Sequence, residues 1–160
     1  MLTIDERPHW MTPVEVHCDL TEVMILSDEE TTDLFCPLAN EVIGWGLEAL
    51  CRLDAPLATL IDVDNGQELR ELDARNAAVV RLRSVWGIRE LVLPEAREVE
   101  LEWCDALERL HAPKATRIRI RHCHKLTHVD APLAATGEAI DCPEWLPDST
   151  ERRLQPPNWV

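Results

Sequence analysis

Residue types recur along this chain every 19 residues, and no other feature limits its fold as strongly. Alanine holds one position in six successive units, and aliphatic residues hold several others. The alanine column is Ala39, Ala58, Ala77, Ala96, Ala115 and Ala134. A leucine column is Leu34, Leu53, Leu72, Leu91, Leu110 and Val129. Several columns at one spacing predict a solenoid, in which each unit is one turn and like residues stack in neighbouring turns.

The unit reads L-x-x-L-x-A-P-x-A-x-x-I-x-I, followed by five residues that commonly include cysteine. The I-x-I segment alternates apolar and polar residues as a half-buried strand does, so stacked units predict a parallel sheet. Nineteen residues leave little room for an average helix of about 11 residues. We therefore expect a mainly parallel β solenoid with little helix and with extended or 3₁₀ segments on its convex side. We expect the I-x-I segments to form the main sheet.

Two stretches match a known repeat pattern more closely than the rest of the chain. One runs Ala115-x-x-Ile118-x-Ile120-x-x-Cys123-x-x-Leu126, and the other is Leu107-x-x-Leu110-x-Ala112-Pro113. These stretches resemble the leucine-rich-repeat family, whose unit is L-x-x-L-x-L-x-x-N/C-x-L. The short unit resembles that of bacterial effectors secreted into host cells. The resemblance covers roughly residues 20–146 and implies a protein-binding solenoid.

A chain of 160 residues suits one domain. We expect residues 1–19 to form an N-terminal cap, residues 20–146 to form the repeats and residues 147–160 to form a loose C-terminal arm. A solenoid needs such caps because its end turns would otherwise expose apolar surface. Residues 27–30 (Ser-Asp-Glu-Glu) predict either a helix start or an acidic turn.

Negative charge is concentrated in the first third of the chain. Residues 1–50 hold eleven carboxylates and a single basic residue, Arg7, in a protein of formal net charge −14. Such a field repels nucleic acid and anionic lipid and favours a partner with a basic surface. The alternative is an acidic cap that only maintains solubility.

The sequence also predicts where in the cell the protein is located. It contains no run of about 18 apolar residues that predicts a membrane span. It begins with acidic residues where a secretory signal is basic and then apolar. The six cysteines are not clustered as in a metal site or a disulfide framework. We expect reduced thiols and a cytoplasmic location. The family resemblance adds secretion into a host cell by a route that needs no signal peptide.

Charged residues alternate in sign between the apolar residues of the I-x-I segments. The inner positions are Asp62, Arg81, Glu100, Arg119 and Glu138, and the following positions are Asp64, Arg83, Glu102, Arg121 and Ile140. In a parallel sheet with strands about 4.8 Å apart, each inner carboxylate would lie beside guanidinium groups. This row predicts a ladder of ion pairs that fixes the strand register. A charged recognition surface is the alternative.

The L-x-x-L segments carry outward residues whose signs do not alternate, so this strip is the predicted binding surface. Trp45, in an outward column near the acidic end, is a candidate anchor because tryptophan is frequent in binding hot spots. A tryptophan at a solenoid corner can instead cover the space between turns. The predicted protein-binding residues are Trp45, Asp54, Glu71, Asp73, Glu90, Arg109, His111, His128 and Asp130.

Catalytic and metal-binding patterns are weak. Residues His122, Cys123, His124 and His128, with Cys104 and Cys142, suggest zinc. No C-x-x-C pair accompanies them, and a shared repeat column favours packed thiols. We expect no metal and no cofactor. Nucleophile-elbow and phosphate-loop motifs are missing from the sequence. Carboxylates such as Asp62 and Asp64 could serve a β-helix glycosidase, but their alternation with arginine argues against it.

These features predict a non-enzymatic protein-binding module of leucine-rich-repeat type, present as a monomer or weak dimer. Its partner is another protein with a basic surface, and neither nucleic acid nor a membrane is expected. The resemblance implies a bacterial secreted effector that binds a host protein. One alternative is an acidic immunity or inhibitor protein that neutralises a basic toxin. The other is a carbohydrate-active enzyme built on a parallel β-helix.

Overall fold

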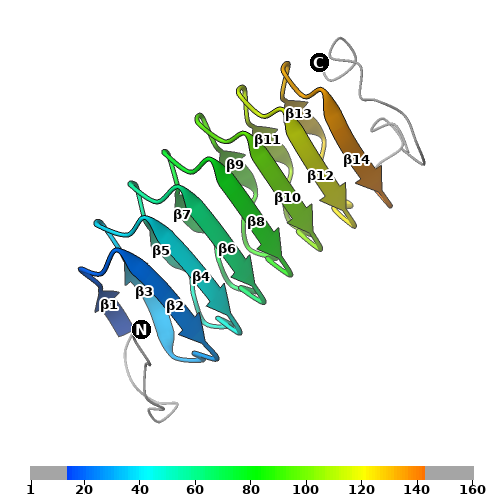
Figure 1. Ribbon diagram of the computed structural model, residues 1–160. Coiled ribbons are helices and arrows are strands. Elements are labelled where there is room, and N and C mark those ends of the chain that lie inside the picture. The colour runs from blue at the N-terminus through cyan, green and yellow to red at the C-terminus, as the bar shows by residue number, and fades with distance from the viewer. Residues whose placement is uncertain (1–13, 143–160) are drawn as a thin grey trace.

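The computed structural model describes residues 14–142, which form a β-solenoid of about seven turns with parallel strand pairing throughout and no helix. The turns stack along one axis, with the seven-stranded main sheet on one side and, on the other, strands most of which have only three residues, here called the short-strand side (Figure 1). The predicted fold class is therefore confirmed. The segments opposite the main sheet, which were predicted to be extended or 3₁₀, are extended strands.

The I-x-I segments form the main sheet, as predicted. Its order is β14-β12-β10-β8-β6-β4-β2, and each strand lies one 19-residue unit from its neighbour. In the pairing of β6 with β8, for example, Ile61 lies beside Val80 and Val63 beside Leu82. The strands are β2 (Glu22–Leu26), β4 (Glu41–Trp45), β6 (Leu60–Asp64), β8 (Val79–Arg83), β10 (Glu98–Glu102), β12 (Arg117–Arg121) and β14 (Thr136–Ile140).

The opposite side of the coil consists of two smaller parallel sheets. The first has the order β1-β3-β5-β7, with β1 (Val14–His17), β3 (Thr31–Phe35), β5 (Arg52–Asp54) and β7 (Glu71–Asp73). The second has the order β13-β11-β9, with β9 (Glu90–Val92), β11 (Arg109–His111) and β13 (His128–Asp130). The short-strand side is thus divided between β7 and β9, whereas the main sheet is continuous.

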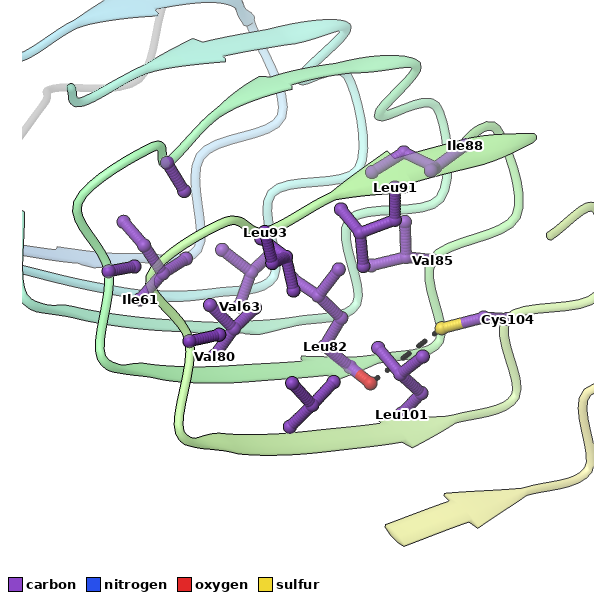
Figure 2. Close-up of a cluster of buried hydrophobic side chains, with 14 of the residues drawn as sticks. Ile61, Val63, Val80, Leu82, Val85, Ile88, Leu91, Leu93, Leu101 and Cys104 are labelled. Atoms are coloured by element: carbon purple, nitrogen blue, oxygen red, sulfur yellow. Dashed lines mark hydrogen bonds between the residues drawn. The ribbon is translucent and has the colours of Figure 1, made fainter. Parts of the chain in front are cut away.

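The core lies between the two sides and repeats from turn to turn. Every member of the alanine column is fully buried. Aliphatic side chains such as Leu82 and Leu101 from the main sheet meet Leu91 and Leu93 from the short-strand side (Figure 2). No single turn could enclose these side chains, so their burial depends on stacking.

Proline occupies tight turns that lead from the short-strand side to the next main strand. These residues are Pro37, Pro56, Pro94, Pro113 and Pro132, and Arg75 takes the equivalent position after β7. The backbone N–H of Ala58 donates to the carbonyl of Ala55 at 3.1 Å, and Ala115 donates likewise to Ala112 at 3.0 Å. Pro56 and Pro113 therefore hold the second position of a four-residue turn. Proline suits that position because its φ is preset and its missing N–H is not needed there.

At the other corner, the residue after each main strand has a left-handed backbone. These residues are Ser27, Gly46, Asn65, Ser84, Trp103, His122 and Asp141, with φ between 51° and 65°. Glycine adopts this conformation at no steric cost because it lacks a Cβ, and asparagine tolerates it better than most residues. For other residues the clash of the Cβ with the backbone makes it costly. These positions also recur every 19 residues, so the repeat includes the backbone conformation of this corner as well as the apolar columns.

The interruption between β7 and β9 coincides with an irregular corner at Trp86 and Gly87. The N–H of Trp86 donates to the carbonyl of Gln67 in the preceding turn at 3.3 Å. A Cβ on Gly87 would lie only 2.5 Å from the carbonyl oxygen of Leu69. This corner therefore packs backbone against backbone, which only glycine permits.

The predicted end segments are described only in part. Val14–His17, within the predicted cap, is β1 and pairs with β3 at the edge of the short-strand side. Residues 1–13 of the predicted cap and the segment 143–160, which includes the predicted arm, lie outside the described residues. Residues 27–30 form the acidic turn and not a helix, because Asp28 Oδ1 accepts hydrogen bonds from the N–H groups of Glu30 and Thr31 at 2.9 and 3.0 Å.

No helix in residues 14–142 has the length and apolarity of a membrane span.

Candidate protein-binding surfaces

The outward face of the main sheet carries a ladder of ion pairs from β6 to β14. Arg81 lies 3.7 Å from a carboxylate oxygen of Asp62 and 3.7 Å from one of Glu100. Arg119 lies 3.3 Å from Glu100 and 3.0 Å from Glu138. The hydrogen bond with Glu100 raises the pKa of the Arg119 guanidinium. The predicted alternation is confirmed, and because these charges satisfy one another this part of the face retains little charge for a ligand.

Eight of the nine predicted binding residues lie on the short strands, on the side opposite the main sheet. Asp54, Glu71 and Asp73 are on β5 and β7 in the first small sheet. Glu90, Arg109, His111, His128 and Asp130 are on β9, β11 and β13 in the second. The structure therefore brings the eight together in two groups, separated by the interruption between β7 and β9.

Ion pairs occupy much of this predicted strip. Arg109 lies 3.0 Å from Glu90, and His111 Nδ1 lies 2.5 Å from Asp130. Asp73 accepts hydrogen bonds from Arg75, which hold the pKa of its carboxyl group below the usual range. Charges that already have partners gain less from an external one, because binding would have to replace those contacts.

Trp45 lies apart from the other eight, on the outward face of β4 in the main sheet. The strand register places it beside Leu26 of β2, and both side chains are nearly half exposed, at 46% and 48%. Met24 on β2 and Ile43 on β4 form the neighbouring pair. A pair of carboxylates precedes them on the same two strands. We call this surface the N-terminal patch; it consists of Glu22, Met24, Leu26, Glu41, Ile43 and Trp45.

The N-terminal patch continues the same outward columns that carry the ion-pair ladder. Met24 and Ile43 precede Asp62 at 19-residue steps, and Leu26 and Trp45 precede Asp64. Of the patch residues only Trp45 was predicted to bind, because the alternation of charge in these columns begins at Asp62 and Asp64. Extending each column back to β2 would have shown the change from charged to apolar side chains.

The corner of the last described turns holds a third group of side chains. Trp103 stacks on His122, whose Nδ1 lies 3.0 Å from Asp141 Oδ2. The next residues in two of these turns are Cys104 and Cys123, and both thiols are buried. The hydrogen bond with Cys123, together with burial, raises the pKa of the Cys104 thiol. In residues 14–142, no three His, Cys, Asp or Glu side chains are grouped closely enough to hold a metal ion.

The chain matches no known family model, no curated protein and no solved structure. Its function is therefore inferred from its own surfaces.

Proposed function

We propose that this protein is a non-enzymatic protein-binding module whose partner presents a basic surface. The observation that supports this proposal best is the N-terminal patch, where exposed apolar side chains lie beside carboxylates. No lysine or arginine lies on β2, β4 or β6, the three strands at this end of the main sheet, so these strands supply no cation to the patch. Exposed apolar surface combined with unbalanced charge is typical of a recognition site.

An enzymatic function has less support. Asp62 lies 3.4 Å from Arg83 and 3.7 Å from Arg81, so it is engaged in the ladder. A glycosidase requires two carboxyl groups that face a substrate on either side of the scissile bond. From β6 to β14 the carboxylates of the main sheet instead lie along its outward face, interleaved with arginine.

Membership of the leucine-rich-repeat family and secretion as a bacterial effector are part of this proposal. The two matching stretches, 107–113 and 115–126, and the short unit support them.

The acidic first turns would equally serve an immunity or inhibitor protein that covers a basic toxin. A gene for a secretion chaperone beside this one would favour the effector, and a gene for a toxin would favour the inhibitor. An effector would act inside a host cell, whereas an immunity protein would act in the cytoplasm of its producer.

Affinity capture with matched variants tests the proposal. The full-length protein is immobilised, and bound proteins from native and candidate host lysates are identified by mass spectrometry. The patch variant carries Leu26→Ser and Trp45→Ser. The control carries Leu57→Ser and Leu133→Ser, which change residues that are similarly exposed at the proline corners.

The expected result is a basic protein that the wild type and the control capture and the patch variant does not. Equal capture by the patch variant, with circular dichroism showing that all three proteins fold, would contradict the proposal.

A further inference from the structure

The N-terminal patch has two chemically different halves arranged along the strands. At the start of β2 and β4, Glu22 lies directly beside Glu41. Further along the same strands, Met24 pairs with Ile43 and then Leu26 with Trp45. A shallow pocket of about 190 Å³ lies where the two halves meet, lined by Glu22, Val23, Met24, Glu41 and Ile43. Acidic and apolar groups therefore face one pocket.

Glu98 occupies the same outward column as Glu22 and Glu41, and unlike them it has arginine neighbours. Glu98 on β10 lies 3.2 Å from Arg117 and 3.6 Å from Arg81. Glu22 and Glu41 have each other as strand neighbours, and Leu60 follows Glu41 on the next strand. Like charges directly opposite each other in a sheet are destabilising. A cation placed between these two carboxylates would remove that repulsion.

The charge distribution identifies the kind of occupant. A second copy of this chain docked face to face would bring two such carboxylate pairs together without adding a cation. Residues 1–13 contain Asp5 and Glu6 against Arg7, so the side chains of this segment carry a formal charge of −1 and do not supply the net positive charge that would complement the patch. A separate basic partner is the occupant that balances both halves.

We propose that the N-terminal patch binds an extended, basic, amphipathic segment of another protein. A lysine or arginine of that segment would bind between Glu22 and Glu41, and apolar side chains would cover the Met24–Ile43 and Leu26–Trp45 pairs. Outward positions on one strand recur every second residue, at about 6.5–7 Å. A segment lying along β2 and β4 would therefore repeat lysine-x-apolar-x-apolar. This inference rests on the proposed function and specifies its partner.

Fluorescence anisotropy with labelled peptides tests this assignment on the full-length protein. The first peptide has lysine, leucine and phenylalanine at alternate positions with threonine between them, and its ends are blocked. The second peptide has glutamate in place of lysine. Each is titrated with the wild type, with Glu22→Gln/Glu41→Gln, with Trp45→Ser and with Glu98→Gln as a matched control.

The lysine peptide should bind the wild type and Glu98→Gln alike, and at least tenfold more weakly to the other two variants. The glutamate peptide should bind the wild type at least tenfold more weakly than the lysine peptide. Raising the salt concentration should weaken binding of the lysine peptide, because its ion pairs are exposed. Equal affinity for the two peptides, or an unchanged affinity of Glu22→Gln/Glu41→Gln, would overturn the assignment.

Two further outcomes separate this inference from the proposed function. If a captured partner depends on Trp45 but binds Glu22→Gln/Glu41→Gln normally, the protein-binding function stands and the cation site is wrong. If sedimentation shows that the single change Trp45→Ser abolishes a wild-type dimer, the occupant is a second copy, and the assignment of a basic partner is wrong.

Discussion

Trp103 and His122 stack face to face across neighbouring turns, with ring centroids 4.0 Å apart and ring planes inclined by 13°. Both residues have left-handed backbones, with φ of 56° and 54°. That conformation costs a residue with a side chain about 1–2 kcal/mol, and a well-placed aromatic pair contributes about 0.5–1.5 kcal/mol. The stacked rings therefore offset part of the strain that the solenoid imposes at this corner.

The left-handed column predicts a stabilising glycine substitution. Ser84 has a φ of 52°, so Ser84→Gly should relieve strain and raise the free energy of unfolding by up to about 1 kcal/mol, after the greater flexibility of unfolded glycine is subtracted. Trp103→Gly relieves the same strain but loses the stack on His122, so it should be neutral or destabilising. Chemical denaturation of both variants measures the difference. A loss of stability in Ser84→Gly would contradict the interpretation of this column.

The ion-pair ladder predicts a destabilising charge reversal. Glu100→Arg would place three arginines in line, with Arg81 and Arg119, and would remove two ion pairs. Exposed pairs contribute about 0.2–1 kcal/mol each, so the loss with added repulsion should be about 1–2 kcal/mol. The melting temperature should then fall by about 2–8 °C. Glu41→Arg is the control: it places a base beside Glu22 and should not lower the melting temperature.

At Gly87 even a substitution by alanine should destabilise the fold. Its added Cβ would lie 2.5 Å from the Leu69 carbonyl oxygen and 2.9 Å from that of Glu68. Backbone atoms cannot move aside as a side chain can, so Gly87→Ala should cost about 2–3 kcal/mol, at the upper end for overpacking. In Gly66→Ala the nearest atom is a side-chain carbon of Val63, 3.0 Å away, and the cost should be smaller. Thermal melts in parallel give the comparison, and equal costs would argue against the packing described for this corner.

Glu138 predicts a pH-dependent contribution to stability. Hydrogen bonds from Arg121 at 2.9 Å and Arg119 at 3.0 Å lower the pKa of its carboxyl group from 4.5. Because the folded pKa lies below the unfolded one, this carboxylate stabilises the fold above pH 4.5 and loses that effect as the pH falls through the lowered value.

Melting curves of wild type and Glu138→Gln over a pH series check this sign. The variant should melt below wild type at pH 7, and the difference should disappear in acid. Glu29→Gln, a change at an exposed position after β2, controls for net charge. A difference between Glu138→Gln and wild type that stays constant down to acid pH would contradict the assignment.

Much of the fold follows from the sequence alone. Every pairing in the main sheet joins residues one repeat apart, such as Val99 with Ile118, because stacking at that spacing is how a short unit buries its apolar side. The ladder follows from the same register, since Asp62 and Arg81 must become neighbours once the turns stack. Such periodic features can be predicted from the sequence because each 19-residue unit adopts the same local structure.

The tertiary structure decided the features that depart from the repeat. The close approach of Gly87 to the carbonyl of Leu69 and the division between β7 and β9 occur at the same corner, and the residue pattern encodes neither of them. Leu26 lies one repeat before Trp45, so the period predicts that the two residues stack, but only the structure shows that both side chains remain nearly half exposed. A 19-residue period determines which residues stack, whereas three-dimensional packing determines which stacked side chains remain exposed together and without a charge partner.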